Sequence, residues 1–80
     1  MPLDTMTYQF FHVARDAELE EHAGRPVYYI FNNKSNTAIG RILWCWAWRQ
    51  WVATFAEDAQ FSRGCLADVE NAIGKITAAE

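Results

Sequence analysis

Apolar residues recur at helical spacing near the end of this chain of 80 residues. They follow one another in steps of three, four and three, which places them on one stripe of an α-helix: Leu66, Val69, Ile73 and Ile76. Ser62 precedes the stripe and belongs to the residue types that cap helices by accepting a hydrogen bond from a free backbone N–H. Because a helix with one apolar stripe is stabilised mainly by packing, the rest of the chain must supply the surface that it covers.

The residues before this helix favour β-strands. Four segments rich in β-branched and aromatic residues predict strands over 6–13, 27–31, 38–46 and 50–56. Residues 32–36 predict a turn, because Asn and Ser side chains bind their own backbone and Asn tolerates positive φ. Gly40 inside the third strand predicts a bulge or a close backbone contact.

Residues 15–23 are rich in Glu, Ala and Leu and are followed by Gly24 and Pro26, which predicts a short N-terminal helix. At this length we expect one domain, residues 1–80. The predicted fold class is α+β. It consists of a small antiparallel sheet of three to four strands, one C-terminal helix packed on one face, and the short N-terminal helix.

The strand over 38–46 carries apolar side chains on both faces. Alternation directs one set to one side (Ile42, Trp44, Trp46) and the other set to the opposite side (Ile39, Arg41, Leu43, Cys45). One helix covers one face, and a large uncovered aromatic surface is unusual for a monomer. We therefore expect either the N-terminal segment or a partner to cover the second face.

Composition excludes several classes of protein. Hydrophobic residues make up 51% of the chain and charged residues 21%, as in a globular protein. The N-terminal residues lack the basic start and small-residue cleavage site of a signal peptide, and the longest apolar run, residues 42–48, is too short to cross a bilayer. Two cysteines, Cys45 and Cys65, predict reduced thiols in the cytosol, with one disulfide between them as the alternative.

No pattern predicts chemistry at a bound group. The chain lacks paired metal ligands at the usual spacings, a P-loop and a dinucleotide-binding motif. We expect no metal, no cofactor, no catalytic residue and therefore no enzyme. His12 is interpreted as a strand-face residue, His22 as a helix-end residue, and Cys65 as packing at the seam between helix and sheet.

Charge is distributed unevenly along the chain. Residues 1–21 carry net −4, residues 22–56 net +4 and residues 57–80 net −3. Acids of the two flanks are candidates for a patch that binds a basic groove on another protein: Asp16, Glu18, Glu20, Glu21, Glu57 and Asp58. The simpler alternative is a solvated helix face.

The basic middle supports a different hypothesis. Bases of single-stranded nucleic acid stack on aromatic rings while Arg or Lys contacts phosphate. The residues that fit this pattern are Lys34, Arg41, Arg49, Trp44, Trp46, Trp48 and Trp51. The alternative is that most of the tryptophans are core, and the overall acidity argues against strong affinity for phosphate.

Several short motifs follow one another between Val27 and Ile73. In chain order they are YYIFNN (28–33), GRILW (40–44), WRQWV (48–52), FS (61–62) and CLADV (65–69). Their combined order resembles a group of small, mostly uncharacterised phage and prophage accessory proteins. The resemblance implies a strand meander followed by a helix, in agreement with the prediction from the residues.

By class, the resemblance also implies a function. Small acidic phage proteins are often stoichiometric inhibitors of host defence, and anti-CRISPR proteins are the leading example. We therefore expect an inhibitor in the host bacterial cytoplasm whose partner is a multisubunit, Cascade-type CRISPR effector complex. Trp46 and Trp48 would anchor it and the acidic residues would meet Lys and Arg of the DNA path. Direct contact with membrane or nucleic acid is not expected, whereas a homodimer is compatible with this function.

Overall fold

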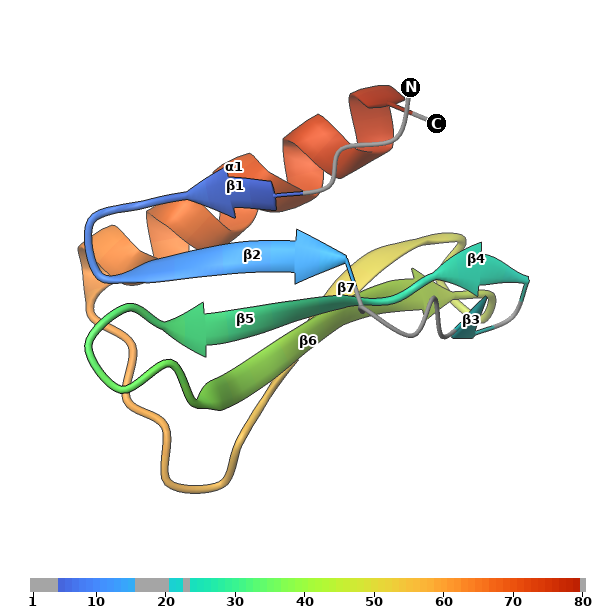
Figure 1. Ribbon diagram of the computed structural model, residues 1–80. Helices are drawn as coiled ribbons and strands as arrows, with labels where there is room; N and C mark the ends of the chain where they lie inside the picture. Colours follow the sequence, from blue (N-terminus) through green and yellow to red (C-terminus); the bar gives the residue numbers. More distant parts are fainter. Residues whose placement is uncertain (1–4, 16–20, 23, 80) are drawn as a thin grey trace.

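A computed structural model of the chain describes residues 5–15, 21–22 and 24–79. Seven strands and one helix succeed each other along the chain (Figure 1). Their bounds are β1 Thr5–Thr7, β2 Phe11–Arg15, β3 Glu21–His22, β4 Arg25–Pro26, β5 Tyr28–Asn32, β6 Ala38–Cys45, β7 Gln50–Phe55 and α1 Arg63–Ala79. No helix within these ranges is long and apolar enough to span a membrane.

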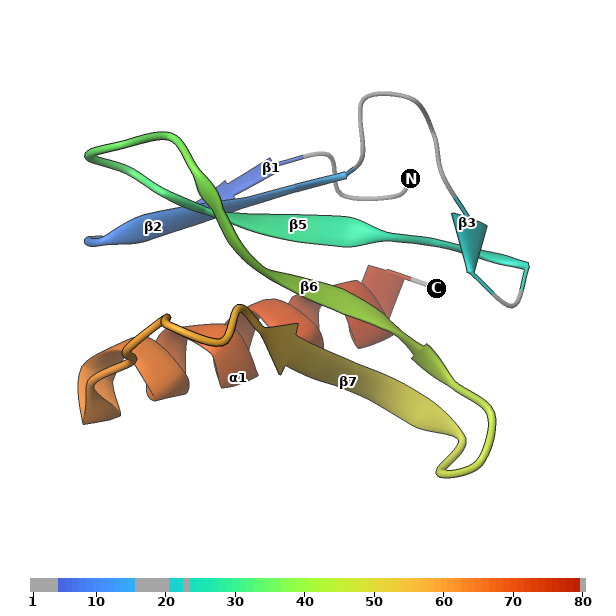
Figure 2. The same ribbon diagram turned by 90° about the horizontal axis from the view of Figure 1, so that it is seen from below.

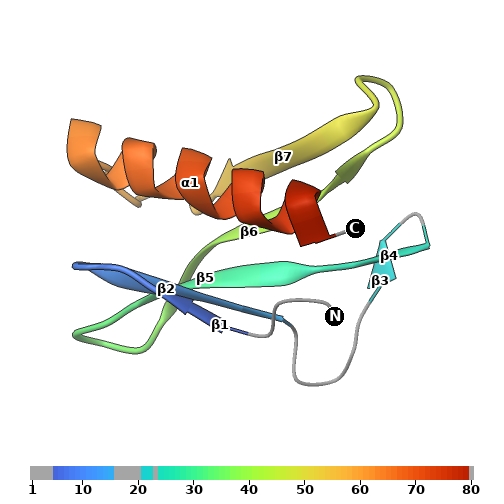
Figure 3. The same cartoon turned by 90° about the horizontal axis from the view of Figure 1, so that it is seen from above.

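Five strands form one antiparallel sheet in the order β1-β2-β5-β6-β7, and β3 pairs with β4 as a separate short hairpin. The helix α1 lies over one face of the large sheet (Figure 3). From the opposite side, β6 and β7 pass in front of the helix (Figure 2). The architecture is therefore two layers, α+β, as the sequence predicts.

The N-terminal third differs from the prediction. The single strand expected over 6–13 is two strands joined by a turn, so the sheet has five strands rather than three or four. The helix expected over 15–23 is not seen: Arg15 ends β2 opposite Tyr28, and Glu21–His22 form β3. Residues 16–20 and 23 lie outside the described residues. An isolated helix of this length has little stability of its own. Arg15 instead forms backbone hydrogen bonds as part of the pairing between β2 and β5.

The core lies between α1 and the sheet. Strand residues facing the helix include Val13, Ile30 and Ile42, all fully buried. The register places Val13 opposite Ile30, and Ile42 opposite the buried Tyr28. The helix contributes Val69, Ala72 and Ile76. The predicted stripe is confirmed at Val69 and Ile76, which are buried, and Ile73 is half-buried and packs against the core. It was wrong at Leu66, which is 49% exposed, and it lacked Ala72, which is completely buried. The small Ala72 side chain lets the helix approach the sheet closely.

The start of α1 confirms the predicted cap. The backbone N–H of Cys65 donates to Ser62 Oγ over 3.2 Å, and the N–H of Leu66 donates to the Ser62 carbonyl over 2.9 Å. These bonds satisfy donors that have no partner within the helix itself. Cys65 is half-buried and packs against the core, as expected of a residue at the seam.

A hydrogen bond connects the N-terminal strands to the helix. The Tyr8 hydroxyl, in the turn between β1 and β2, donates to Asn71 Oδ1 over 2.8 Å. Burial, with a smaller contribution from the nearby Asp68 carboxylate, raises the pKa of Tyr8 above its usual value. The phenol therefore stays protonated and keeps donating across the neutral range.

Gly40 allows β6 to bend across its neighbours. The register between β5 and β6 shifts at Ile30 and Phe31, directly opposite Gly40, which is the bulge that the sequence predicts. A Cβ atom on Gly40 would lie 2.7 Å from the Thr54 carbonyl oxygen of β7. Backbone cannot move away as a flexible side chain does, so only glycine fits this close approach.

We expect Gly40→Ala to lower the free energy of unfolding by about 1–3 kcal/mol, because the methyl group overpacks the sheet. Gly74→Ala is the matched control. Its Cβ would meet nothing within 4 Å, and alanine in a helix is favoured over glycine by about 0.5–1 kcal/mol. Urea unfolding followed by circular dichroism measures both changes. Equal midpoints for the two variants would contradict this account of Gly40.

Candidate binding surfaces

The face of the large sheet opposite α1 is not covered by any described residue of the N-terminal strands. Residues 5–15 extend the edge of the sheet through β1 and β2 and do not fold back over it (Figures 1 and 2). We call this surface the open face. Its central side chains are His12, Ala14, Tyr29, Phe31, Arg41, Leu43, Val52 and Thr54.

Three rings on two adjacent strands form a row on the open face. His12 stacks on Phe31 with ring centroids 5.3 Å apart and planes 20° apart, and Tyr29 lies 6.2 Å from Phe31. His12 Nδ1 lies 2.7 Å from Asn33 Oδ1, while the Asn33 amide donates to the Tyr8 carbonyl. Since Oδ1 accepts, Nδ1 carries a proton, and the imidazole is held in one orientation.

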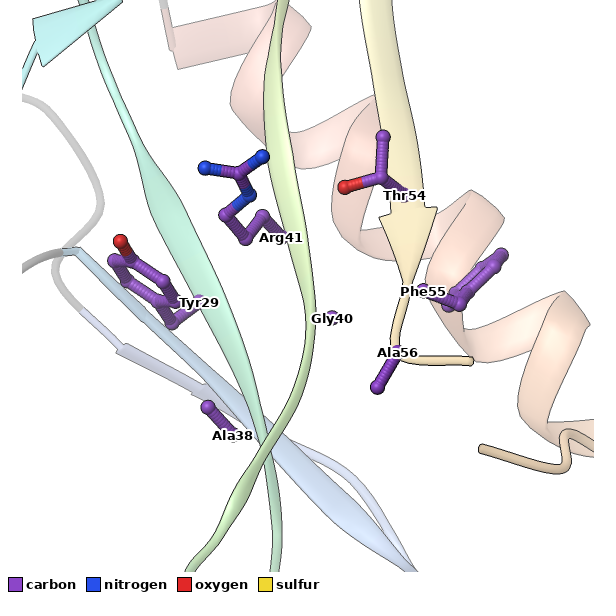
Figure 4. Close-up of a pocket in the computed structure, with 7 residues that line it drawn as sticks. All are labelled: Tyr29, Ala38, Gly40, Arg41, Thr54, Phe55 and Ala56. Atoms are coloured by element: carbon purple, nitrogen blue, oxygen red, sulfur yellow. The ribbon is translucent and has the colours of Figure 1, made fainter. Parts of the chain in front are cut away.

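A shallow hollow of about 360 Å³ lies beside this row (Figure 4). The register places Tyr29, Arg41 and Thr54 side by side on β5, β6 and β7. The Gly40 backbone also lines the hollow. Arg41 and Thr54 are exposed, so the hollow presents a guanidinium and a hydroxyl to solvent.

The four tryptophans divide between core and surface. Trp51 is 5% exposed and belongs to the core. Trp44 is half-buried, and its ring centroid lies 5.8 Å from that of Trp51. Trp46 and Trp48 are 59% and 69% exposed and stand in the turn between β6 and β7. We call this pair the tryptophan tip. Core packing therefore explains two of the four tryptophans and leaves two on the surface.

Trp46 is held in place by its neighbours. Its ring meets the Trp44 ring edge to face at 5.6 Å. The Arg25 guanidinium of β4 lies 4.1 Å from the Trp44 ring centre and 5.6 Å from that of Trp46. The short β3–β4 hairpin thus contributes a cation–π contact that orients the tip. His22, expected at a helix end, instead pairs with Arg25 in this hairpin.

The turn that carries the tip contains neither Gly nor Pro, so the sequence gives only a weak signal for it. Arg49 adopts φ 52°, in the left-handed region. Non-glycine residues occupy this region infrequently, mostly in turns. This conformation lets the chain reverse from β6 into β7.

The predicted acidic patch is not assembled by the described residues. Glu57 and Asp58 are exposed in the loop after β7, at the opposite end of that strand from the tryptophan tip. Glu21 lies in β3, which pairs with β4 beside the tip. Asp16, Glu18 and Glu20 lie outside the described residues.

In the part of the chain that the structure describes, no group of three or more His, Cys, Asp or Glu residues is arranged to hold a metal ion. Cys45 and Cys65 are both free thiols, half-buried in different elements.

Comparison of the chain with models of protein families, with curated protein sequences and with solved structures finds no match.

We expect Trp51→Ala to lower the free energy of unfolding by about 3–5 kcal/mol, since it empties a buried ring site. Trp48→Ala should change it by less than about 0.5 kcal/mol, because the ring is mostly in water. Urea unfolding of both variants at the same protein concentration measures the difference. A large loss of stability in Trp48→Ala would show that the outermost ring is structural and would remove it from the binding surface.

Proposed function

We propose that this chain is a non-enzymatic phage protein that inhibits host defence as an anti-CRISPR protein, binding a Cascade-type CRISPR surveillance complex and blocking its binding of target DNA. It would act in the host bacterial cytoplasm. The observation that supports a binding role is the tryptophan tip, because two large rings stand exposed on a turn without contributing to the core. The resemblance to phage accessory proteins supports the choice of partner.

The tip is suited to serve as an anchor. Tryptophan and arginine dominate the energetics of protein interfaces, and the tip combines Trp46 and Trp48 with Arg25 and Arg49 nearby. Trp46 is already oriented by Trp44 and Arg25, so little conformational freedom is lost on binding. A rigid aromatic anchor favours a hydrophobic pocket on a protein subunit.

Acidic residues supply the second part of the proposal. Glu21 is the one predicted acid whose described backbone lies beside the tip, and in the sequence it closely follows Asp16, Glu18 and Glu20. Carboxylates at this position would compete with DNA phosphates for Lys and Arg of the partner. Glu57 and Asp58 lie at the other end of β7, so we assign them a secondary contact.

The test is inhibition of target-DNA binding by a purified Cascade-type complex. We expect the double variant Trp46→Ala/Trp48→Ala to raise the half-inhibitory concentration by about 30-fold or more, as truncation of hot-spot residues does. Leu66→Ala is the matched control, because Leu66 is a similarly exposed apolar residue on α1. It should inhibit like the wild type.

Charge reversal tests the acidic contact separately. Glu18→Lys/Glu21→Lys should abolish inhibition while the circular dichroism spectrum stays unchanged, because cationic residues repel the basic path of the partner. Glu57→Lys/Asp58→Lys should weaken inhibition less. Full inhibition by the first pair would reject the acidic contact, and a wild-type protein that binds no CRISPR effector complex would reject the proposed function.

A further inference from the structure

We propose that the open face of the sheet binds single-stranded nucleic acid, with bases stacked on the ring row of His12, Tyr29 and Phe31 and a backbone phosphate at Arg41. This surface is distinct from the tryptophan tip, and the inference does not rest on the proposed inhibition.

The composition of the open face is the first argument. A sheet face in contact with water normally carries polar side chains, whereas this one carries three rings together with Leu43 and Val52. The rings are half-buried and packed on one another, at centroid distances of 5.3 and 6.2 Å, so they form a preorganised platform. Stacking of bases on such rings is tolerant of sequence, because every base has a π-face.

Charge is the second argument. Among the described residues of the open face, Arg41 carries the one permanent charge, and no Asp or Glu shares the face with it. It lines the hollow with the Thr54 hydroxyl, one strand away from the ring row. In the sequence, Asp16 follows the open-face residue Ala14 by two positions, and Glu57 and Asp58 follow Ala56 at the rim of the hollow. A guanidinium and a hydroxyl beside stacked rings match the alternation of phosphate and base in a single strand.

The same charge argues against a second copy of the chain as the occupant. In a two-fold symmetric pair formed through the open face, each Arg41 near the centre would approach its symmetry mate. Two like charges would then be removed from water without a carboxylate to pair them, which is unfavourable. A duplex is also a poor occupant, because pairing and stacking hide the faces of its bases.

The experiment measures fluorescence anisotropy of fluorescein-labelled oligo(dT) of about 12 nucleotides, a length within the range that small single-strand binders cover. We expect wild-type protein to bind at micromolar concentration in low salt, and a duplex of the same length to bind at least tenfold more weakly. Phe31→Leu should weaken binding by about fivefold to a hundredfold, since it removes one stacking surface.

Arg41→Gln separates charge from stacking. It should lower the slope of log affinity against log salt by about 0.7, which corresponds to one lost phosphate contact on a single strand. Arg63→Gln, an exposed arginine in the first turn of α1, is the matched control and should leave the slope unchanged. Circular dichroism verifies that each variant is folded, and Arg41 is exposed, so its variant keeps the test informative if Phe31→Leu unfolds.

Three results would overturn the inference. The first is absence of oligo(dT) binding by wild-type protein in low salt. The second is binding that Arg41→Gln leaves unchanged, or that is equal for duplex and single strand. The third is a dimer in sedimentation that dissociates in Arg41→Glu or Phe31→Leu, which would identify a second copy as the occupant of the open face.

Discussion

The packing of one helix against one face of the sheet determines the rest of this molecule. α1 places Val69, Ala72 and Ile76 over Ile30, Ile42 and Trp51, and this contact buries the core. A chain of this length has a thin core and gains most of its stability from such a layer. Because the described residues provide one long helix for a five-stranded sheet, the second sheet face remains uncovered by it, and side chains on that face are available to other molecules.

Local signals predicted the elements from Val27 onward. Ser62 and the apolar spacing identified α1, the Asn-rich turn separated β5 from β6, and Gly40 marked the bulge. The N-terminal part was predicted poorly for two reasons. The turn between β1 and β2 has no Gly, Pro or Asn, and Arg15 pairs with β5, a strand that lies further along the sequence. Helical propensity in residues 15–23 is a local preference, whereas pairing along β5 is set by tertiary structure.

The candidate surfaces were predictable to different degrees. Exposure of Trp46 and Trp48 was expected, although the sequence alone does not distinguish them from Trp44 and Trp51, which pack inward. The ring row was missed, since it forms only when the register brings His12 opposite Phe31. Alternation in β2 and β5 was the available signal, but it does not indicate which strands are neighbours. The acids were grouped by their charge, and β7 separates Glu57 and Asp58 from the tip, whereas Glu21 lies beside it in β3.

The position of α1 at the end of the described chain has a consequence for biosynthesis. Strands β1 to β7 are translated before the helix, and without it the buried residues Val13, Ile30 and Ile42 have no cover. A nascent chain on the ribosome therefore exposes an apolar sheet face until residues 69–76 leave the exit tunnel. The domain therefore completes its core only after the helix has been synthesised, because the helix supplies the residues that cover this face of the sheet.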